Sequence, residues 1–477
     1  MEKIMQIHSK DNVAVALDNV DNIPAGHKVA LCDIKTGEKI IKYGFSIGVA
    51  TTDIKKGDHV HTHNVKSDMP KTLEYTYTPE ACDLDKKAPL KFMGYKRKNG
   101  KVGIRNEVWI IPTVGCVNSI AKAIEDGSKQ FVTDNVDGVF CYSHPYGCSQ
   151  LGDDQLYTQR LLSGLIHHPN AAGVLVLGLG CENNNIPELK KVIGDYDPER
   201  VRFLNAQDCE DEIEKGIETV KDLCAFANTF KRTECDISDL VIGLKCGGSD
   251  GFSGITANQL VGRISDSVIA MGGSSILTEV PEMFGAETIL MSRARNRDVF
   301  DKTVKLINDF KAYFTRYGEP VDENPSPGNK EGGITTLADK SLGCTQKGGT
   351  APVEDVLDYG EPVRKKGLSL LNGPGNDLVA ACALAASGAH IILFTTGRGT
   401  PFGCPVPTMK ISSNTPLSIR KKNWIDFNAG VIAEGTPFAD CEQDLMQQIL
   451  AVASGQRVLC EYLDKRDIAI FKDGVTL

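Results

Sequence analysis

The 477-residue sequence lacks the marks of several large protein classes. No apolar run approaches the roughly 18 residues that a membrane-crossing helix needs. The N-terminal M-E-K-I-M-Q-I-H is not typical of a signal peptide. Aspartate and glutamate (62) outnumber lysine and arginine (53), and the net charge of −9 gives no basic composition for nucleic acid. We therefore expect a cytoplasmic protein that binds neither membranes nor nucleic acid.

Nucleotide-binding motifs are also missing. Gly178-Leu179-Gly180 follows an apolar run, but Asn183 stands where the G-x-G-x-x-G pattern has its third glycine. The P-loop pattern G-x-x-x-x-G-K-[ST] does not occur in the chain. We therefore expect no nucleotide cofactor.

The 15 cysteines are odd in number and spread over the whole chain. This pattern favours reduced thiols in a cytoplasmic protein over a disulfide framework. Hydrophobic residues make up 41% and charged residues 24%, which is ordinary for a globular protein. The length predicts between two and four domains.

The pattern of predicted secondary structure changes twice along the chain. Residues 1–70 are short strands separated by glycine turns, and the pattern I-x-x-G-x-x-V occurs at 23–29 and again at 54–60. Residues 71–91 are a proline-containing linker. Val-, Ile- and Leu-rich runs then alternate with amphipathic helices over 92–235 and 236–477. The sequence predicts an α/β protein, in which a small all-β domain precedes two Rossmann-like α/β domains with parallel sheets.

Four of the apolar runs end in a cysteine. They are the runs that lead to Cys116, Cys148, Cys181 and Cys246. Ligands of open α/β sheets bind at the carboxyl ends of strands, so we expect these sulfurs to converge on one rim. A convergent set of thiolates suits iron, zinc or an iron–sulfur cluster. The alternative is that each cysteine is a small buried hydrophobic residue.

Histidines accompany two of these features. His144 shares the predicted rim with Cys148 and is a candidate metal ligand or general acid–base, or else a structural residue. His61 and His63 belong to the run His59-Val60-His61-Thr62-His63. Alternate residues of a strand share a face, so these imidazoles would line up for a metal, or form a solvated polar face.

Charged side chains also follow predicted strand ends. The acidic ones are Glu182, Asp250, Glu279 and Glu282. Each is suited to ligating a cation or moving a proton, with helix capping as the alternative. Lys330, in the Gly/Pro-rich passage 318–349, and Arg398, in a glycine loop, are suited to holding a carboxylate. The alternative for both is a solvated surface charge.

Several long motifs together resemble one family. They are H-P-Y-G-C-S-Q-L-G-D-D, V-L-G-L-G-C-E-N-N, C-G-G-S-D-G-F-S-G-I-T-A-N, N-P-S-P-G-N-K-E-G-G and F-T-T-G-R-G-T-P. In this order they resemble the altronate/galactarate dehydratase family over essentially the whole chain. The first 70 or so residues resemble its SAF-type β domain. H-V-H-T-H-N and the C-terminal K-D-G-V-T-L resemble the altronate members more than the galactarate members.

The resemblance implies a hydro-lyase that removes water from a sugar acid. For D-altronate the product would be 2-dehydro-3-deoxy-D-gluconate, and the implied cofactor is a divalent metal, Fe²⁺ or alternatively Mn²⁺. The resemblance leaves a mononuclear ion and an iron–sulfur cluster open. Galactarate dehydration and sulfite elimination from sulfolactate are alternatives on the same scaffold, and a non-enzymatic sugar-acid or metal sensor is an alternative of another class. We expect a small-molecule sugar-acid substrate and a homo-oligomer.

The residues fit such a reaction as follows. His144 would be the base or acid, and Lys330 and Arg398 would anchor the substrate. The cysteine rim, with Glu182 or Asp250, would hold the metal that stabilises the developing enediolate. His61 and His63 are further candidate ligands that would also tune substrate choice.

Overall fold

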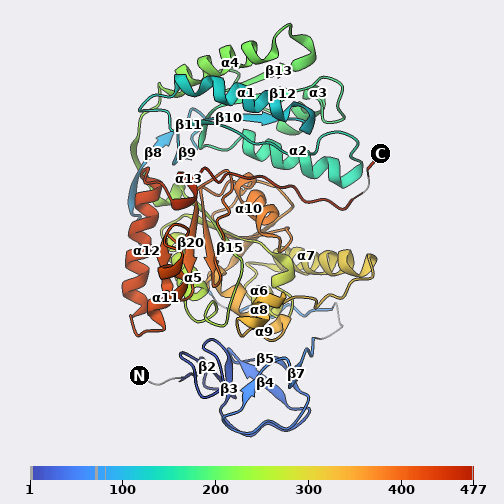
Figure 1. The fold of residues 1–477 in the computed structure, drawn as a ribbon, viewed down its shortest axis with the longest axis vertical. Coiled ribbons are helices and arrows are strands. Elements are labelled where there is room, and N and C mark those ends of the chain that lie inside the picture. The colour runs from blue at the N-terminus through green and yellow to red at the C-terminus, as the bar shows by residue number, and fades with distance from the viewer. Residues whose placement is uncertain (1–3, 70–73, 81, 475) are drawn as a thin grey trace.

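The computed structural model describes residues 4–69, 74–80, 82–474 and 476–477. Three parts follow one another along the long axis in Figure 1, but not in chain order. The N-terminal β domain lies at one end, and the α/β part around α1 to α4 lies at the other. The C-terminal α/β part lies between them and contacts both. The predicted architecture is confirmed.

The N-terminal domain consists of two small antiparallel sheets, β1-β2-β3-β6 and β4-β5-β7. Their strands are β1 (Ile4–Met5), β2 (Val13–Ala16), β3 (Lys28–Ala30), β4 (Lys39–Lys42), β5 (Phe45–Ala50), β6 (His59–Val60) and β7 (Val65–Lys66). The two copies of I-x-x-G-x-x-V lead into β3 and β6, which pair antiparallel with Lys28 opposite Val60 and Val29 opposite His59. The sequence repeat is therefore a pair of hydrogen-bonded neighbours.

The middle of the chain forms a four-stranded parallel sheet in the order β11-β10-β12-β13. Its strands are β10 (Glu107–Pro112), β11 (Gly138–Cys141), β12 (Ala171–Gly178) and β13 (Val201–Asn205). Its helices are η1 (Gly115–Val117), α1 (Asn118–Ser128), η2 (Lys129–Phe131), α2 (Gly152–Ile166), α3 (Ile186–Ile193), η3 (Ala206–Asp208) and α4 (Glu212–Ala227). Every residue of β10 and β12 is buried, as expected for a parallel sheet covered on both faces.

The chain enters and leaves this domain on neighbouring strands. A three-stranded antiparallel sheet in the order β14-β8-β9 consists of β8 (Lys91–Lys96), β9 (Val102–Gly103) and β14 (Thr233–Asp236). β14 runs antiparallel beside β8. The chain therefore enters and leaves the domain at one place, and η4 (Ile237–Asp239) leads onward.

The C-terminal part is built on a seven-stranded parallel sheet in the order β17-β18-β16-β15-β19-β20-β21. Its strands are β15 (Val241–Cys246), β16 (Ser274–Leu277), β17 (Val353–Leu357), β18 (Gly367–Leu371), β19 (Ile391–Thr396), β20 (Thr408–Ser412) and β21 (Phe427–Asn428). Its helices are α5 (Ala257–Ala270), η5 (Val280–Glu282), α6 (Glu287–Ser292), α7 (Arg297–Arg316), α8 (Pro327–Glu331), α9 (Leu337–Cys344), η6 (Thr345–Gly348), α10 (Asp377–Ala386), α11 (Thr415–Arg420), η7 (Ala429–Ile432), α12 (Phe438–Ala453) and α13 (Leu459–Tyr462).

The two α/β parts share one hydrophobic cluster. Trp109 and Tyr142 of the four-stranded domain pack in the same cluster as Phe394 of the seven-stranded sheet. Helices α2 and α10 approach so closely that a Cβ on Gly164 would lie 2.3 Å from the Ala386 carbonyl oxygen. The C-terminal tail then runs back beneath α2 (Figure 1) and bridges Thr476 to Gln150. None of the helices in the described parts of the chain is long and apolar enough to span a membrane.

The Gly/Pro-rich passage 318–349 is not an irregular loop throughout. It contains α8, α9 and η6. Ser326 and Asn329 form a capping box at α8, with Pro327 at the first helical turn, and Thr336 caps α9 through the Asp339 amide. These short, locally capped helices place their connection, residues 332–336, against the N-terminal domain.

Candidate functional site

The N-terminal domain is fastened to the C-terminal part by a buried charge triad. Asp339 on α9 accepts from Lys28 Nζ at 2.8 Å and from Lys42 Nζ at 2.9 Å. Lys28 also donates to the Gly333 carbonyl at 2.7 Å. Burial lowers the pKa of Lys28 to about 8 although Asp339 opposes the shift, and the two lysines hold the pKa of Asp339 below its ordinary value against burial. Removing either sign would leave a buried charge unpaired.

Three imidazoles, which we call the histidine triad, lie beside this charge triad. Nitrogens of His27, His59 and His61 all lie within 4.8 Å of one another, and His27 Nδ1 is 3.0 Å from His59 Nε2. Desolvation lowers the pKa of His59 to about 4 and that of His61 to about 3. The rings are therefore neutral near pH 7, and neutral imidazole is the form that ligates a metal.

The C-terminal part orients these rings. His27 Nε2 lies 3.1 Å from the Glu331 carbonyl oxygen at the end of α8. His61 Nδ1 lies 3.1 Å from Thr335 Oγ1. Such outer partners fix the tautomer and ring orientation of metal-binding histidines. The histidine triad therefore belongs to the N-terminal domain, is oriented by the C-terminal part, and is a candidate metal centre.

His63 lies next to the triad without belonging to it. Its ring centroid is 5.2 Å from that of His59, and its side chain is exposed. The predicted strand over 59–63 is wrong beyond Val60, because Asn64 closes a turn by accepting from the His61 amide at 2.9 Å. The imidazoles nevertheless meet, since His59 and His61 stack with centroids 5.5 Å apart.

The two predicted carboxylate anchors are Arg398, in the loop after β19, and Lys330, on α8. Arg398 Nη2 pairs with Glu331 Oε2 at 3.0 Å, and the side chain of Arg398 is 49% exposed. Lys330, one residue earlier on α8, is also exposed. Glu331 thus contacts His27 through its backbone and Arg398 through its carboxylate.

Asp250 is a buried hydrogen-bond acceptor beneath the loop that carries Arg398. Its carboxylate accepts from Ser253 Oγ at 2.9 Å, Ser413 Oγ at 2.7 Å and Asn414 Nδ2 at 2.8 Å. A Cβ on Gly397, next to Arg398, would lie 2.3 Å from Asp250 Cγ, so this position requires glycine. Burial raises the pKa of Asp250 while these hydrogen bonds oppose the shift. We assign Asp250 to positioning the Arg398 loop rather than to contacting substrate.

Cys246 belongs to a second buried group, with Glu282 and Cys344. Its Sγ is 3.0 Å from Glu282 Oε2 and 3.4 Å from Cys344 Sγ. The ammonium groups around these residues belong to Lys245, Lys340 and Lys347. These ammonium groups form ion pairs with Glu279 and Glu282, so the carboxylates of this group are already compensated without a cation.

The carboxylates of this second group have their pKa values shifted in opposite directions. Burial and then Glu282 raise the pKa of Glu279, whereas Lys340 and its neighbours hold that of Glu282 below its ordinary value against burial. Opposed shifts are typical of acid–base pairs. However, the cavity that touches Cys344 measures about 10 Å³, which is too small for a sugar acid.

The remaining predicted ligands lie on the four-stranded sheet. Cys116, Cys148 and Cys181 are exposed in the loops after β10, β11 and β12. Cys246 ends β15 of the other sheet, so the expected set of four converging sulfurs is not formed. Glu182 is buried, and its oxygens accept from Thr113 Oγ1 and the Leu179 and Gly180 amides, which leaves it a structural role.

Comparison with known proteins assigns all three parts of the chain. The family model described as "D-galactarate/Altronate dehydratase, C-terminal" matches residues 237–476, the second-domain model matches 94–228, and the SAF-domain model of the same family matches 2–68. The altronate dehydratase of Bacillus subtilis (strain 168) is 52% identical over 100% of both chains. That of Escherichia coli (strain K12) is 50% identical over 99% of both chains. The galactarate dehydratase (L-threo-forming) of the latter organism is 33% identical over 95% of this chain and 93% of its own.

The chain belongs to the D-galactarate/altronate dehydratase family. The predicted family, with its SAF domain, is confirmed. In this dehydratase family member the histidine triad lies on the SAF domain, and the residues that orient it lie on the C-terminal domain.

His144, the predicted base or acid, lies in the second domain of this family member, away from the triad. It is buried, its Nε2 donates to the Pro112 carbonyl at 2.8 Å, and its Nδ1 accepts from the Tyr146 amide at 3.2 Å. Burial lowers its pKa to about 4. Both ring nitrogens are used by the backbone, so the geometry favours the structural alternative for His144.

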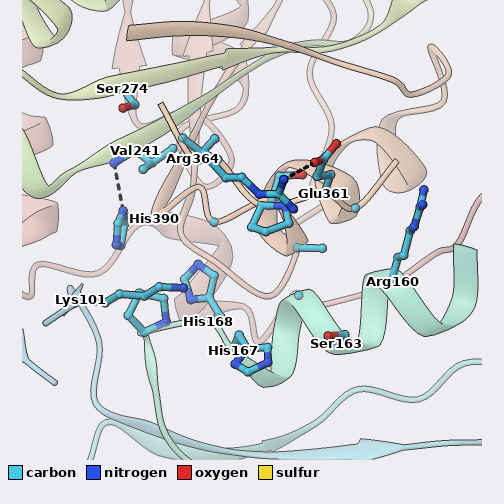
Figure 2. A pocket seen from close by; sticks show the side chains of 18 of the residues that line it. Lys101, Arg160, Ser163, His167, His168, Val241, Ser274, Glu361, Arg364 and His390 are labelled. Carbon is cyan, nitrogen blue, oxygen red and sulfur yellow. Dashed lines mark hydrogen bonds and ion pairs between the residues drawn. The ribbon is translucent and has the colours of Figure 1, made fainter. Parts of the chain in front are cut away.

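A cavity of about 660 Å³ lies between the second and C-terminal domains (Figure 2). It lies at the amino ends of the strands, where Val241, Ser274 and His390 line it. His390 Nδ1 accepts from the Val241 amide at 3.0 Å, and Arg364 pairs with Glu361 at 3.3 Å. Ligands of α/β sheets bind at the opposite ends of strands, so this cavity is not the candidate site.

Sequence reasoning missed His27 and the two residues that orient the triad, Glu331 and Thr335. A signal for His27 was present in the repeat I-x-x-G-x-x-V, since Gly26-His27-Lys28-Val29 matches Gly57-Asp58-His59-Val60. Pairing the two copies places His27 beside His59. Glu331 and Thr335 gave no signal, because they act through a backbone carbonyl and a hydroxyl from a distant domain.

Proposed function

We propose that this protein is a hydro-lyase that dehydrates D-altronate to 2-dehydro-3-deoxy-D-gluconate. Identity to altronate dehydratases, 52% and 50% over essentially whole chains, carries this proposal. Identity to galactarate dehydratase falls to 33%. A cytoplasmic location and a homo-oligomeric assembly belong to the same proposal.

The reaction removes the C2 proton and the C3 hydroxyl as one molecule of water. The C2–H electron pair becomes the C2=C3 bond as the C3–O bond breaks, and the resulting enol becomes the 2-ketone. The difficult step is removal of a proton beside a carboxylate, because charge then develops on an enediolate. The site must therefore stabilise anionic oxygens and handle one proton.

The histidine triad fits a divalent cation by its donor chemistry. Three neutral imidazoles suit a borderline ion such as Fe²⁺, with Mn²⁺ as the alternative. His59 and His61 are half-buried rather than enclosed, which leaves coordination positions for substrate oxygens. When bound there, the cation supplies Lewis-acid stabilisation of the developing charge.

The remaining roles follow from position. Arg398 and Lys330 bind the substrate carboxylate beside the triad, Arg398 with two parallel N–H donors. Asp250 fixes the loop that carries Arg398. His63, exposed beside His59, takes the C2 proton. Glu331 joins the carboxylate-binding side of the site to the metal-binding side.

The decisive experiment is a substrate panel with the anaerobically purified protein and added Fe²⁺. D-altronate, galactarate and (2R)-sulfolactate are offered separately, and formation of a 2-keto-3-deoxy acid or sulfite is measured. We expect steady-state turnover of D-altronate with the highest kcat/KM. Preferred turnover of another acid would overturn the substrate assignment, and no turnover of any acid would overturn the hydro-lyase assignment.

A further inference from the structure

Exposed cysteines are concentrated at one place on the molecule. Cysteine is among the most buried residue types, and of the 15 in this chain four are exposed, Cys32, Cys116, Cys148 and Cys181. Three of these four follow strands of the same parallel sheet. We call Cys116, Cys148 and Cys181 the cysteine rim.

The loops that carry the cysteine rim are tied to one another by backbone hydrogen bonds. The Gly115 amide donates to the Tyr146 carbonyl at 2.9 Å, and the Asn184 amide donates to the Gly147 carbonyl at 2.9 Å. A Cβ on Gly147, where φ is +105°, would lie 2.0 Å from the Thr113 carbonyl oxygen. The close approach of the three loops therefore depends on glycine, and the rim is a built structure rather than three independent loops.

Each sulfur of the rim lies shortly before a helix, Cys116 before α1, Cys148 before α2 and Cys181 before α3. Gln207 Nε2 donates to Cys181 Sγ at 3.6 Å, and donors to sulfur tune iron–sulfur sites.

The spacing of the sulfurs excludes a single ion that all three would bind without rearrangement. Among the described residues, the sets of three ligand atoms within 4.8 Å of one another are the histidine triad and the Cys246 group, and the rim is not among them. A single ion draws its ligands closer than this spacing, whereas a cluster of several irons holds its cysteines farther apart. The rim therefore suits a cluster better than a mononuclear ion.

We propose that Cys116, Cys148 and Cys181 bind an iron–sulfur cluster. The three thiols bind as thiolates and release their protons. Clusters commonly have four cysteine ligands, so a four-iron cluster on this rim keeps one iron open to an oxygen ligand from solution. The site belongs to the second domain and is separate from the histidine triad, so it does not depend on the proposed function.

The test uses the full-length protein, purified without oxygen and reconstituted with Fe²⁺ and sulfide. Iron, acid-labile sulfide, visible absorption and the EPR spectrum after reduction are measured for wild type, C116S, C148S, C181S and the triple variant. We expect cluster absorption and sulfide in wild type and their loss to background in the triple variant. C32S, which removes the exposed cysteine outside the rim, is the matched control and keeps both signals.

Each outcome is decisive. Wild type without acid-labile sulfide, or a correctly folded triple variant that keeps it, overturns the cluster. Circular dichroism and thermal unfolding of the variants establish that they fold. The proposed function is tested by a different measurement, because a protein that does not turn over D-altronate can still contain acid-labile sulfide. Iron lost in H59A with sulfide retained shows that the two centres are distinct.

Discussion

His27 Nδ1 and His59 Nε2 lie 3.0 Å apart across the pairing of β3 with β6. The two side chains come from the two copies of one sequence repeat, and His61 completes the set. A contact between two neutral imidazoles gains little by itself. The same nitrogens are well placed to share a cation, which would account for three adjacent histidines beside a buried lysine, Lys28.

Removal of a triad histidine is expected to remove the metal. H59A and H61A should lose the iron that the histidine triad binds, but not iron held at the cysteine rim, and should lower kcat/KM by at least about 100-fold, since loss of an outer partner alone costs about 10- to 100-fold. Metal analysis after dialysis and a dehydration assay measure both effects. H8A, which removes an exposed histidine of the same domain, is the control. Full iron content in H59A would place the metal elsewhere.

The metal-free protein should lose stability on acidification. Desolvation lowers the pKa of His59 to about 4 and that of His61 to about 3 from an ordinary value of 6.5. Between pH 6.5 and the lowered pKa of each ring, the unfolded chain binds more protons than the folded one. The contribution of these two neutral histidines to the free energy of unfolding is therefore complete above pH 6.5 and is lost as the pH falls to 4 and then 3. Thermal unfolding of wild type and of a doubly substituted H59Q/H61Q protein, followed from neutral pH downward, measures the difference. Equal pH slopes would contradict the assignment.

Arg398 is expected to bind substrate rather than to stabilise the fold. R398A should raise KM for the sugar acid about 10- to 100-fold, because a hydrogen bond to a charged group contributes about 1.5–3 kcal/mol. The melting temperature should not change, since the side chain is half exposed. R420A, an exposed arginine at the end of α11, is the control. An unchanged KM in R398A would exclude this contact.

Asp339 is expected to control docking of the SAF domain. D339N leaves Lys28 and Lys42 both buried without their carboxylate partner, which should destabilise the protein by about 3–5 kcal/mol. Limited proteolysis between the SAF and second domains, together with denaturant unfolding, measures the loss. D309N, which removes the exposed partner of Lys305, should behave as wild type. Unchanged protease resistance in D339N would contradict the docking role.

His144 should affect stability without affecting chemistry. H144A removes two hydrogen bonds to backbone groups, so we expect a loss of about 1–3 kcal/mol of unfolding free energy. Below its melting temperature the variant should retain the kcat of wild type, because the ring lies in the second domain and both its nitrogens bond to backbone groups. A folded variant without turnover would return His144 to the mechanism.

The contrast between Cys246 and Arg398 shows how far the sequence leads. Both were selected because they follow buried strands, and both do lie at carboxyl ends of the seven-stranded sheet. Arg398 is half exposed and pairs with Glu331, whose carbonyl oxygen contacts His27. Cys246 is instead enclosed with Lys245, because its side chain points into the protein and not toward the loops. The order of strands in a sheet and the direction of side chains at strand ends depend on tertiary packing, which local sequence patterns do not reveal.

The sequence by itself determined the three parts of the chain, the parallel sheets and the family, since strand periodicity, glycine turns and long motifs are local properties. The tertiary structure decided which candidates share a site. It separated the cysteine rim from Cys246 by assigning them to different sheets. It joined His27, His59 and His61 to a loop some 270 residues later, at Thr335. Such contacts arise from the docking of whole domains, and burial of the Lys28–Asp339 pair fixes that docking.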